Sequence, residues 1–383
     1  MRRLVVISPV PLNISLIRFY YLDFLQSSGV PVEFWDISSI FGALPHKEAE
    51  TRPYAHRLAS FSELEAACRG GKLKESLTIM AFAYEPRSFR IYQLLSRSAG
   101  ELGWIESGVM PSATNVSERG LRNTLRIWLR PRKIASAVIK RAAIAARRAG
   151  LIRGFDVVFT AGSAAQEGQS SNLVPINYCD YDDWLETQHT DERLVSGQYA
   201  VYLDQYAPHH PDLLLSGIER LIDPDRYYRA LNGFFALLEA RHRVEVVIAA
   251  HPKATYSQNP FDGRRIFWRS TRQLSRFCEF AINNSSTSMS YPILDYKPIA
   301  FFTTDEIARF YAPIGLDSFP STCALMLGQT CVNIDHSSRD QARIETADRK
   351  RYDAYKYRYL ASSQTEGRLS REIFLDWLRK PSR

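Results

Sequence analysis

Residues 246–253 read Val-Val-Ile-Ala-Ala-His-Pro-Lys, an apolar run that stops at a histidine, a proline and a lysine. Such a run, rich in β-branched residues, predicts a strand buried on both faces of a parallel sheet. Ligands of open α/β sheets bind beyond the carboxyl ends of the strands, so His251, Pro252 and Lys253 are candidate ligand-binding residues. A histidine there can donate a hydrogen bond to a phosphate oxygen, and Pro252 fixes the backbone beneath it. Taken alone, a His-Pro dipeptide is also typical of a simple turn.

A second polar cluster follows the next strongly apolar run. Phe280–Asn283 leads into Asn-Ser-Ser-Thr-Ser at residues 284–288, and an apolar stretch follows. Successive backbone amides at a helix start, with hydroxyls beside them, make an anion-binding site. The alternative is a Ser/Thr cap of that helix. We therefore predict that Ser285, Ser286 and Thr287 join His251 in binding a nucleotide phosphate.

Short apolar runs alternate with longer amphipathic ones along the whole chain, which predicts parallel sheets with helical crossovers. At 383 residues the chain is long enough for two domains. The acidic stretch 182–197 is the candidate hinge between them. The other predicted strands are Leu4–Ile7, Val32–Trp35, Leu77–Ala83, Val157–Thr160, Val174–Tyr178, Tyr199–Leu203, Ile299–Phe302 and Val332–Ile334, and the predicted helices are Ser15–Gln26, Pro224–Ala240 and Ser370–Lys380.

The His-Pro element, the Ser-Ser element and the later run Leu294-Asp-Tyr-Lys-Pro-Ile299 together resemble the donor-binding half of bacterial sialyltransferases and polysialyltransferases. They are also similar to the Kdo transferases of capsule synthesis and to CDP-glycerol phosphotransferases. The resemblance covers Tyr199 to Tyr311. It implies an α/β fold of the GT-B class, two Rossmann-like domains facing across a cleft, with a cytidine nucleotide held by His251, Ser285 and Ser286. The implied domains are an acceptor domain (1–185), a nucleotide-sugar donor domain (195–345) and a C-terminal helical tail (346–383).

The function that this resemblance implies is sugar transfer in bacterial surface polysaccharide or lipooligosaccharide synthesis. The expected donor is a CMP-activated nonulosonic acid or Kdo, and the acceptor is a glycan. We expect the transfer to be inverting. We also expect it to be independent of a metal or other cofactor, because fixed hydrogen-bond donors can stabilise the departing phosphate. The alternatives are a CDP-glycerol or UDP-sugar transferase, a nucleotide-sugar epimerase of similar fold, or an anionic-polymer binding module. No known nucleic-acid motif is present, so nucleic acid is not an expected partner.

The related families carry an acidic pair followed by glycine, whose second acid is the general base on the acceptor. Here the matching segment is Gln166-Glu167-Gly168, which departs at its first position. Asp180 and Glu85 also follow predicted strands and are equal candidates for the base. The sequence leaves the choice among these three acids open.

Three further features bear on ligands. Asp204 and Gln205 end the first predicted strand of the second half, a position suited to donor binding. His209 and His210 are adjacent, but no carboxylate spacing completes a metal site. The five cysteines form no C-x-x-C pair, so neither a disulfide framework nor a zinc site is predicted.

The net charge of +8 is concentrated between Arg119 and Arg153. A basic amphipathic stretch of this kind can lie on anionic lipid, or it can form a solvated helix on the rim of the first domain. The segment lacks any run of about 18 apolar residues, as does the rest of the chain, and the amino terminus lacks a signal-peptide pattern. We expect a cytoplasmic protein with possible peripheral contact to the membrane. The basic residues are Arg122, Arg126, Arg130, Arg132, Lys133, Lys140, Arg141, Arg147 and Arg148, and the apolar ones Leu125, Trp128, Leu129, Ile134, Val138 and Ile144.

Overall fold

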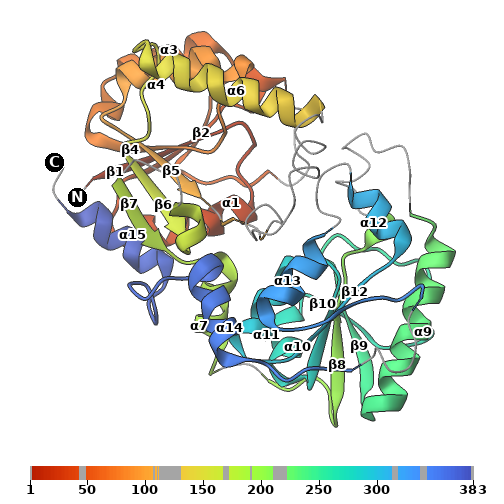
Figure 1. The fold of residues 1–383 in the computed structure, drawn as a ribbon. Coiled ribbons are helices and arrows are strands. Elements are labelled where there is room, and N and C mark those ends of the chain that lie inside the picture. Colours follow the sequence, from red (N-terminus) through yellow and green to blue (C-terminus); the bar gives the residue numbers. More distant parts are fainter. Residues whose placement is uncertain are drawn as a thin grey trace. The chain divides into compact units, whose positions relative to one another are not determined.

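The computed structural model describes residues 2–42, 49–106, 108–109, 111, 131–166, 172–189, 192–209, 222–312, 318–336 and 343–380. These residues divide into two compact units, each built on its own sheet (Figure 1). The first unit contains the described residues of 2–109, 131–179 and 361–380, and the second contains Pro111 and those of 180–360.

The described part of the first unit holds a seven-stranded sheet in the order β3-β2-β1-β4-β5-β6-β7, with every neighbouring pair parallel. From β1 the chain builds outward on one side and then returns to build on the other, which is the doubly wound Rossmann arrangement. The strands are β1 (Arg3–Ser8), β2 (Val32–Asp36), β3 (Ala55–Arg57), β4 (Ser76–Met80), β5 (Glu101–Glu106), β6 (Val157–Ala161) and β7 (Asn172–Ile176).

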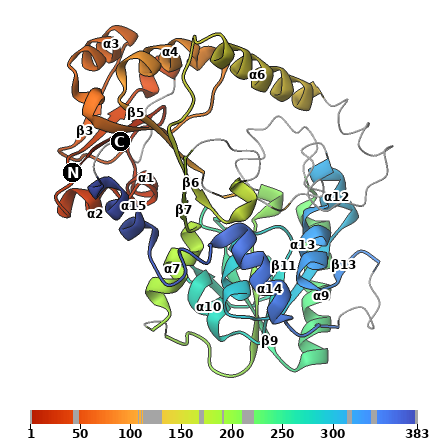
Figure 2. The same cartoon turned by 60° about the vertical axis from the view of Figure 1, so that its left-hand side comes forward.

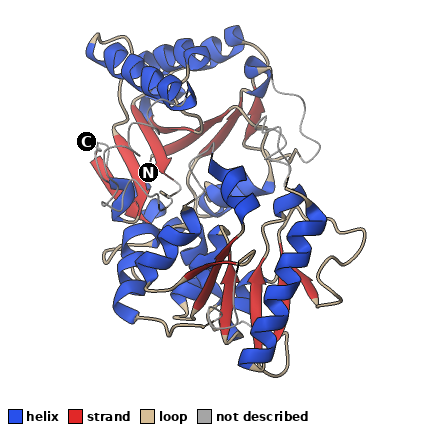
Figure 3. Cartoon of the chain, turned by 45° about the vertical axis from the view of Figure 1, so that its right-hand side comes forward, coloured by secondary structure: helices blue, strands red, loops and turns tan. Residues whose placement is uncertain are grey.

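Helices cover both faces of this sheet (Figure 3). One face packs against α3 (Phe61–Arg69), α4 (Phe89–Ser98) and α6 (Pro131–Arg148), and the other against α1 (Ile14–Phe19), α2 (Leu22–Ser27) and α15 (Ser370–Arg379). The helix predicted over Ser15–Gln26 is in fact two helices, because Tyr21 between them has a left-handed φ of 55°.

The C-terminal helix α15 completes the core of the first unit (Figure 2). Phe374 and Trp377 place their rings 4.5 and 5.3 Å from the ring of Phe159 on β6. The backbone amide of Arg2 donates to the carbonyl oxygen of Leu378 at 3.0 Å. The two ends of the chain are therefore held together by both packing and hydrogen bonds.

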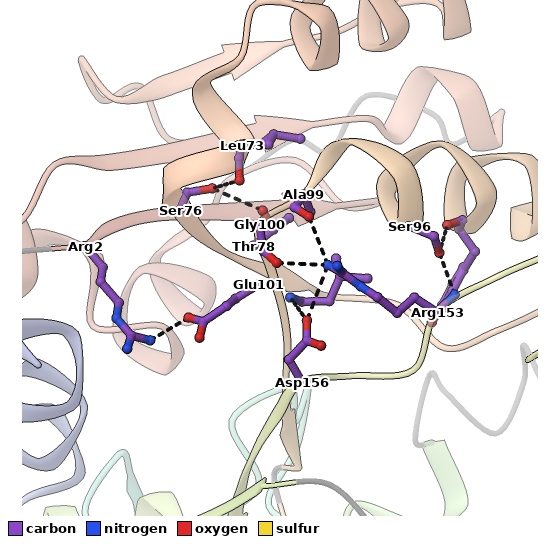
Figure 4. A network of polar contacts seen from close by, with 12 residues as sticks. Arg2, Leu73, Ser76, Thr78, Ser96, Ala99, Gly100, Glu101, Arg153 and Asp156 are labelled. Atoms are coloured by element: carbon purple, nitrogen blue, oxygen red, sulfur yellow. Dashed lines mark hydrogen bonds and ion pairs between the residues drawn. The ribbon is translucent and has the colours of Figure 1, made fainter. Parts of the chain in front are cut away.

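A polar network joins the strand starts of the first unit (Figure 4). The guanidinium of Arg153 donates to the carbonyl oxygens of Ala99 (2.9 Å) and Gly100 (3.2 Å). Asp156 accepts a bond of 2.7 Å from the backbone amide of Leu102. These contacts tie the start of β6 to the start of β5, at the sheet edge opposite the carboxyl ends of the strands.

The described part of the second unit holds a six-stranded parallel sheet in the order β10-β9-β8-β11-β12-β13, the same winding as in the first. The strands are β8 (Tyr199–Leu203), β9 (Glu245–Ala250), β10 (Ile266–Trp268), β11 (Phe280–Asn283), β12 (Ile299–Thr303) and β13 (Cys331–Asn333). Helices α9 (Pro224–His242) and α12 (Asp305–Tyr311) pack on one face of this sheet. The other helices are α7 (Cys179–Thr187), α10 (Thr271–Phe277), α11 (Ser290–Leu294), α13 (Phe319–Leu327) and α14 (Arg349–Tyr355).

Two parallel sheets with helices on both faces confirm the predicted α/β fold class, the GT-B construction of two Rossmann-like domains. Strands β3, β5 and β10 were not among the predicted ones. The predicted hinge begins inside α7, where Asp183 and Trp184 form hydrogen bonds with Tyr291 and Asp295 of the second unit. None of the helices among the described residues has both the length and the apolar composition needed to cross a bilayer.

Candidate functional site

The carboxyl ends of β8, β9 and β11 form the topological switch point of the second unit. Strand β8 pairs with β9 on one side and with β11 on the other. From β9 the sheet continues outward to β10, and from β11 it continues in the opposite direction to β12 and β13. Leu203 pairs with Ala249, and Tyr202 pairs with Ile282, so the three strands end nearly level. Adjacent strands lie about 4.8 Å apart, which brings the three following loops within roughly 10 Å of one another. The loops are those that carry Asp204, His251 and Ser285.

His251 is held by its own loop. The backbone amide of Lys253 donates to Nδ1 of His251 at 3.2 Å, and the amide of Ala254 donates to the carbonyl oxygen of His251 at 2.8 Å. Because Nδ1 is the acceptor, the neutral ring carries its hydrogen on Nε2. The imidazole is half-buried, whereas Pro252 and Lys253 are exposed. His251 therefore carries its N–H donor on Nε2 at the carboxyl edge of the sheet, next to the exposed Lys253.

Asp204 lies at the end of β8 and is only 3% exposed. One carboxylate oxygen accepts from the backbone amide of His251 (3.2 Å) and from the hydroxyl of Tyr256 (2.5 Å), and the other accepts from the amide of Tyr206 (2.9 Å). Burial raises the pKa of Asp204 above its ordinary value. Its carboxylate thus binds the chain's own loop. The neighbouring Gln205 has a buried Oε1 with no hydrogen-bond partner among the described residues.

The serine cluster is shaped by two asparagines that the sequence reasoning did not select. Oδ1 of Asn283 accepts from the backbone amide of Ser286 at 3.0 Å, and Oδ1 of Asn284 accepts from the hydroxyl of Ser285 at 2.6 Å. Both asparagines are buried, and Asn284 also donates to the carbonyl oxygen of Phe302. Asparagine at a strand end is a common turn signal, which is why these two did not stand out.

The hydroxyl of Ser286 in this cluster does not cap the helical turn that follows it. Ser286 precedes the short turn η6 (Thr287–Met289) but makes no side-chain capping bond to it. Thr287 is exposed, and Ser285 and Ser286 are half-buried. The simple capping alternative therefore does not account for Ser286.

Asp180 is the predicted base candidate that the structure brings to this cluster. The hydroxyl of Ser290 contacts the carboxylate of Asp180 and lies 3.1 Å from the carbonyl oxygen of Thr287. One turn further along α7, Asp183 accepts from the hydroxyl of Tyr291 at 2.9 Å. Ser290 and Tyr291, which follow the serine cluster in the chain, thus hold α7 against this part of the second unit.

Glu85 lies in the first unit, beside a cavity of about 480 Å³ at the switch point between β1 and β4. Its carboxylate accepts from Nε of Arg87 at 2.6 Å, and Arg87 lies over the ring of Phe41 at 5.4 Å. The cavity is lined by Pro9, Val10, Phe41, Ala81, Phe82, Ala83, Glu85 and Arg87. Apolar side chains line it together with one acid and one base, Glu85 and Arg87.

Several predicted residues lie outside this description. Glu167 and His210 are not among the described residues, and His209 ends the short turn η5 (Ala207–His209). Arg122, Arg126 and Arg130 also fall outside them. Among the residues that are described, no group of three or more His, Cys, Asp or Glu side chains is arranged to hold a metal ion.

The described end of the basic stretch is part of α6. Arg141 and Arg148 are exposed on this helix, and the apolar side chains of Val138 and Ile144 are 58% and 47% exposed beside them. Positions 141, 144 and 148 share one helix face because of their spacing. This face therefore combines cations with exposed apolar side chains.

No family model and no curated protein matches the sequence. Solved structures of similar fold include spinosyn forosaminyltransferase SpnP, at 13% identity and a TM-score of 0.43 over 99% of this chain and 94% of that one. MurG of Acinetobacter baumannii is 8% identical, with a TM-score of 0.47 over 100% of both chains. The glycosyltransferase SnogD of Streptomyces nogalater is 14% identical, with a TM-score of 0.45 over 99% of this chain and 98% of that one.

Proposed function

We propose that the chain is a glycosyltransferase whose second unit binds the phosphate of a nucleotide-activated sugar. The observation that carries this proposal is the convergence of three loops at one switch point, with the Nε2–H of His251 and the hydroxyls of the serine cluster at the same sheet edge. Ligands of open α/β sheets bind at this place. Imidazole and hydroxyl donors suit a phosphate, and the exposed Lys253 adds a positive charge.

The proposed reaction is a direct displacement at the anomeric carbon of the donor. A carboxylate accepts the proton of the acceptor hydroxyl, whose oxygen forms the new glycosidic bond as the bond to the nucleotide phosphate breaks. Negative charge then grows on the departing phosphate. His251 and the hydroxyl of Ser286 are donors already in place and stabilise this charge without rearranging, whereas the hydroxyl of Ser285 first turns away from Asn284.

The donor that we propose is CMP-linked, either a nonulosonic acid or Kdo. CMP leaves with a single phosphate, and one imidazole with a pair of hydroxyls suits a group of that size. The resemblance of the His-Pro and Ser-Ser elements to CMP-sugar transferases supports the same choice. The alternatives are a UDP-sugar, which leaves a nucleoside diphosphate, and CDP-glycerol, whose glycerol phosphate is transferred with release of CMP.

The acceptor, we infer, binds at the cavity of the first unit that Glu85 lines. Three acids remain candidates for its base: Glu167, Asp180 and Glu85. The bond between Asp180 and Ser290, close to the serine cluster, supports Asp180, whereas the position of Glu85 at the proposed acceptor cavity supports Glu85.

Nucleotide binding tests the proposal directly. CMP, CDP, UDP and GDP are each added to the wild-type protein and to His251→Ala, and the unfolding temperature is recorded. A ligand at 100 times its dissociation constant stabilises the folded state by roughly 2.7 kcal/mol. We expect the largest shift with CMP and its loss in His251→Ala. No shift with any of the four nucleotides would refute nucleotide binding, and a preference for UDP would refute the CMP donor.

Product analysis separates the transferase from the epimerase alternative. An epimerase converts its nucleotide sugar without an acceptor, whereas a transferase forms a new glycan only when an acceptor is present. We expect conversion of CMP-sialic acid or CMP-Kdo to depend on an added glycan. Isomerised nucleotide sugar in the absence of acceptor would favour the epimerase.

We further propose that the basic stretch 119–153 contacts an anionic membrane, where a lipid-linked glycan would be the acceptor. The exposed cations of α6 and the apolar side chains beside them support this partner. Each cation near such a surface contributes about 1 kcal/mol.

A further inference from the structure

The loop that carries His251 is clamped by the loop that follows β8. Besides the two bonds to Asp204, the carbonyl oxygen of Thr255 accepts from the hydroxyl of Tyr206 at 3.1 Å. The rings of Tyr206 and Tyr256 meet edge to face with their centres 5.3 Å apart. The bonds of Asp204 and Tyr206 thus hold both ends of the segment 251–256.

Asp204 is a buried carboxylate that forms no ion pair with any residue that the structure describes. Its charge is therefore balanced by hydrogen bonds from backbone amides and one phenol. Tyr256 keeps its proton, because burial and the Asp204 charge raise its pKa well above the ordinary value. Burying an acid in this way is unfavourable unless each oxygen is hydrogen-bonded, and here both oxygens accept bonds from the two loops.

We propose that Asp204 and Tyr256 are positioning residues that hold the backbone of His251 so that its imidazole can bind the donor phosphate. The role of His251 itself rests on the proposed function. One carboxylate oxygen of Asp204 accepts hydrogen bonds from the His251 amide, at the start of the loop, and from the Tyr256 hydroxyl, at its far end. This oxygen therefore fixes the positions of both ends. Neither residue needs to touch the nucleotide.

Ionised Asp204 accepts both bonds more strongly than the neutral acid does. The loop should therefore loosen, and activity fall, as the pH drops through the pKa of Asp204. The titratable groups that face it are the phenols of Tyr202, Tyr227, Tyr228 and Tyr256. The bond from Tyr256 lowers the pKa of Asp204, so its removal raises that pKa.

The test uses Tyr256→Phe, which removes one hydroxyl, and Asp204→Asn, which keeps an acceptor oxygen but cannot ionise. Amide hydrogen exchange of the segment 250–257 is followed in the full-length protein without nucleotide. Loss of a hydrogen bond to a buried charge should speed exchange there about tenfold or more in Tyr256→Phe. The matched control is Tyr54→Phe, which removes a tyrosine–aspartate bond of the same length, 2.5 Å to Asp23, in the first unit. It should leave exchange in this segment unchanged.

The pH dependence of sugar transfer from a CMP-sugar gives a second readout that a purely structural role would not move. The acid limb should shift to higher pH in Tyr256→Phe, whereas Asp204→Asn should lack the part of that limb that belongs to Asp204. Unchanged exchange in Tyr256→Phe, or an acid limb identical to that of the wild type, would overturn the proposal. If Tyr256→Phe folds poorly, the exchange and pH profile of Asp204→Asn decide instead. If the wild type neither binds CMP nor transfers sugar, the proposed function fails, while the exchange result still decides whether these two residues hold the loop.

Discussion

The backbone amide of Lys253 donates a hydrogen bond to Nδ1 of His251, with 3.2 Å between the two nitrogens. The imidazole is therefore oriented by the residue two places further along the chain, and its Nε2–H is the donor of the neutral ring. A donor that is oriented before the ligand arrives requires little reorganisation during a reaction. Because of this bond, we expect the loss of His251 to lower activity more than the loss of the exposed Lys253.

Replacing His251 with alanine should lower turnover by about 100-fold or more, the usual effect of losing one preorganised donor to a developing charge. The fold should be unaffected, because the ring is only half-buried. Turnover with a CMP-sugar and the unfolding temperature are the two measurements. The exposed His189 is the control, and His189→Ala should behave as the wild type. Wild-type turnover in His251→Ala would remove the phosphate site from consideration.

Among Glu167→Gln, Asp180→Asn and Glu85→Gln, we expect one variant to lose turnover by about 100-fold or more, since removing a general base has effects of this size. CMP binding should persist in that variant. Asp183→Asn provides a control on the same helix as Asp180, because Asp183 also bonds a side chain of α11. If all three variants keep their activity, the base is another residue.

Asp204→Asn should gain stability relative to the wild type as the pH rises. The pKa of Asp204 is raised in the folded protein, so its contribution to stability is full below the unfolded value and is lost as the pH rises through the folded value. The neutral asparagine lacks this loss. The amide nitrogen of asparagine cannot accept the bonds of the oxygen that it replaces, so the variant also loses some stability at every pH. We expect the free energy of unfolding in urea, variant minus wild type, to rise between pH 4 and pH 8. A difference that falls over this range would contradict the raised pKa.

Gly100→Ala should destabilise the first unit. A Cβ at this position would lie 2.0 Å from the carbonyl oxygen of Lys74, a backbone atom that cannot move without shifting the turn before β4. Strain of this kind typically lowers the free energy of unfolding by about 1–3 kcal/mol. Urea unfolding measures the effect. Gly233→Ala is the control, because this exposed position in α9 has no heavy atom within 4 Å of the added Cβ, and it should be stabilising by about 0.5–1 kcal/mol.

Reversing the charges of the basic stretch should abolish binding to anionic vesicles. The variants are Arg141→Glu with Arg148→Glu, and a second set that reverses Arg122, Arg126, Arg130, Arg132 and Lys133. Activity on a lipid-linked acceptor should fall, while activity on a short soluble acceptor should not change. Vesicle binding of the wild type should also weaken with salt, because exposed charges are screened within about 8–10 Å at physiological ionic strength.

The control for this experiment reverses Arg226 and Arg229, which are exposed on α9 of the second unit. It changes the net charge as much as the double variant on α6 does, and it should retain vesicle binding. Equal loss of activity on both acceptors would assign the basic residues to the active site or to the fold. Unchanged vesicle binding would leave the stretch as a solvated surface.

Local sequence predicted most of the strands that carry the site. Strands β8, β9 and β11 are continuous apolar runs, and burial on both faces of a parallel sheet requires such runs. Strand β5 was missed because it reads Glu-Leu-Gly-Trp-Ile-Glu, with charges at both ends and a central glycine. At Gly103 an added Cβ would lie 2.6 Å from Cδ1 of Ile79, so the packing of β4 accounts for that glycine.

The sequence by itself determined that polar residues follow the buried strands, and hence that His251, Asp204 and the serine cluster lie at one edge of a sheet. It did not determine which side chains meet there. The strand order sets β8 between β9 and β11, and this places the carboxylate of Asp204 on the amide of His251 and on Tyr256. In the same way, Ser290 meets Asp180 from 110 positions away in the chain. The physical reason is that apolar periodicity is local and records only burial, whereas these bonds join residues far apart in the chain and exist only once the sheet has ordered its strands.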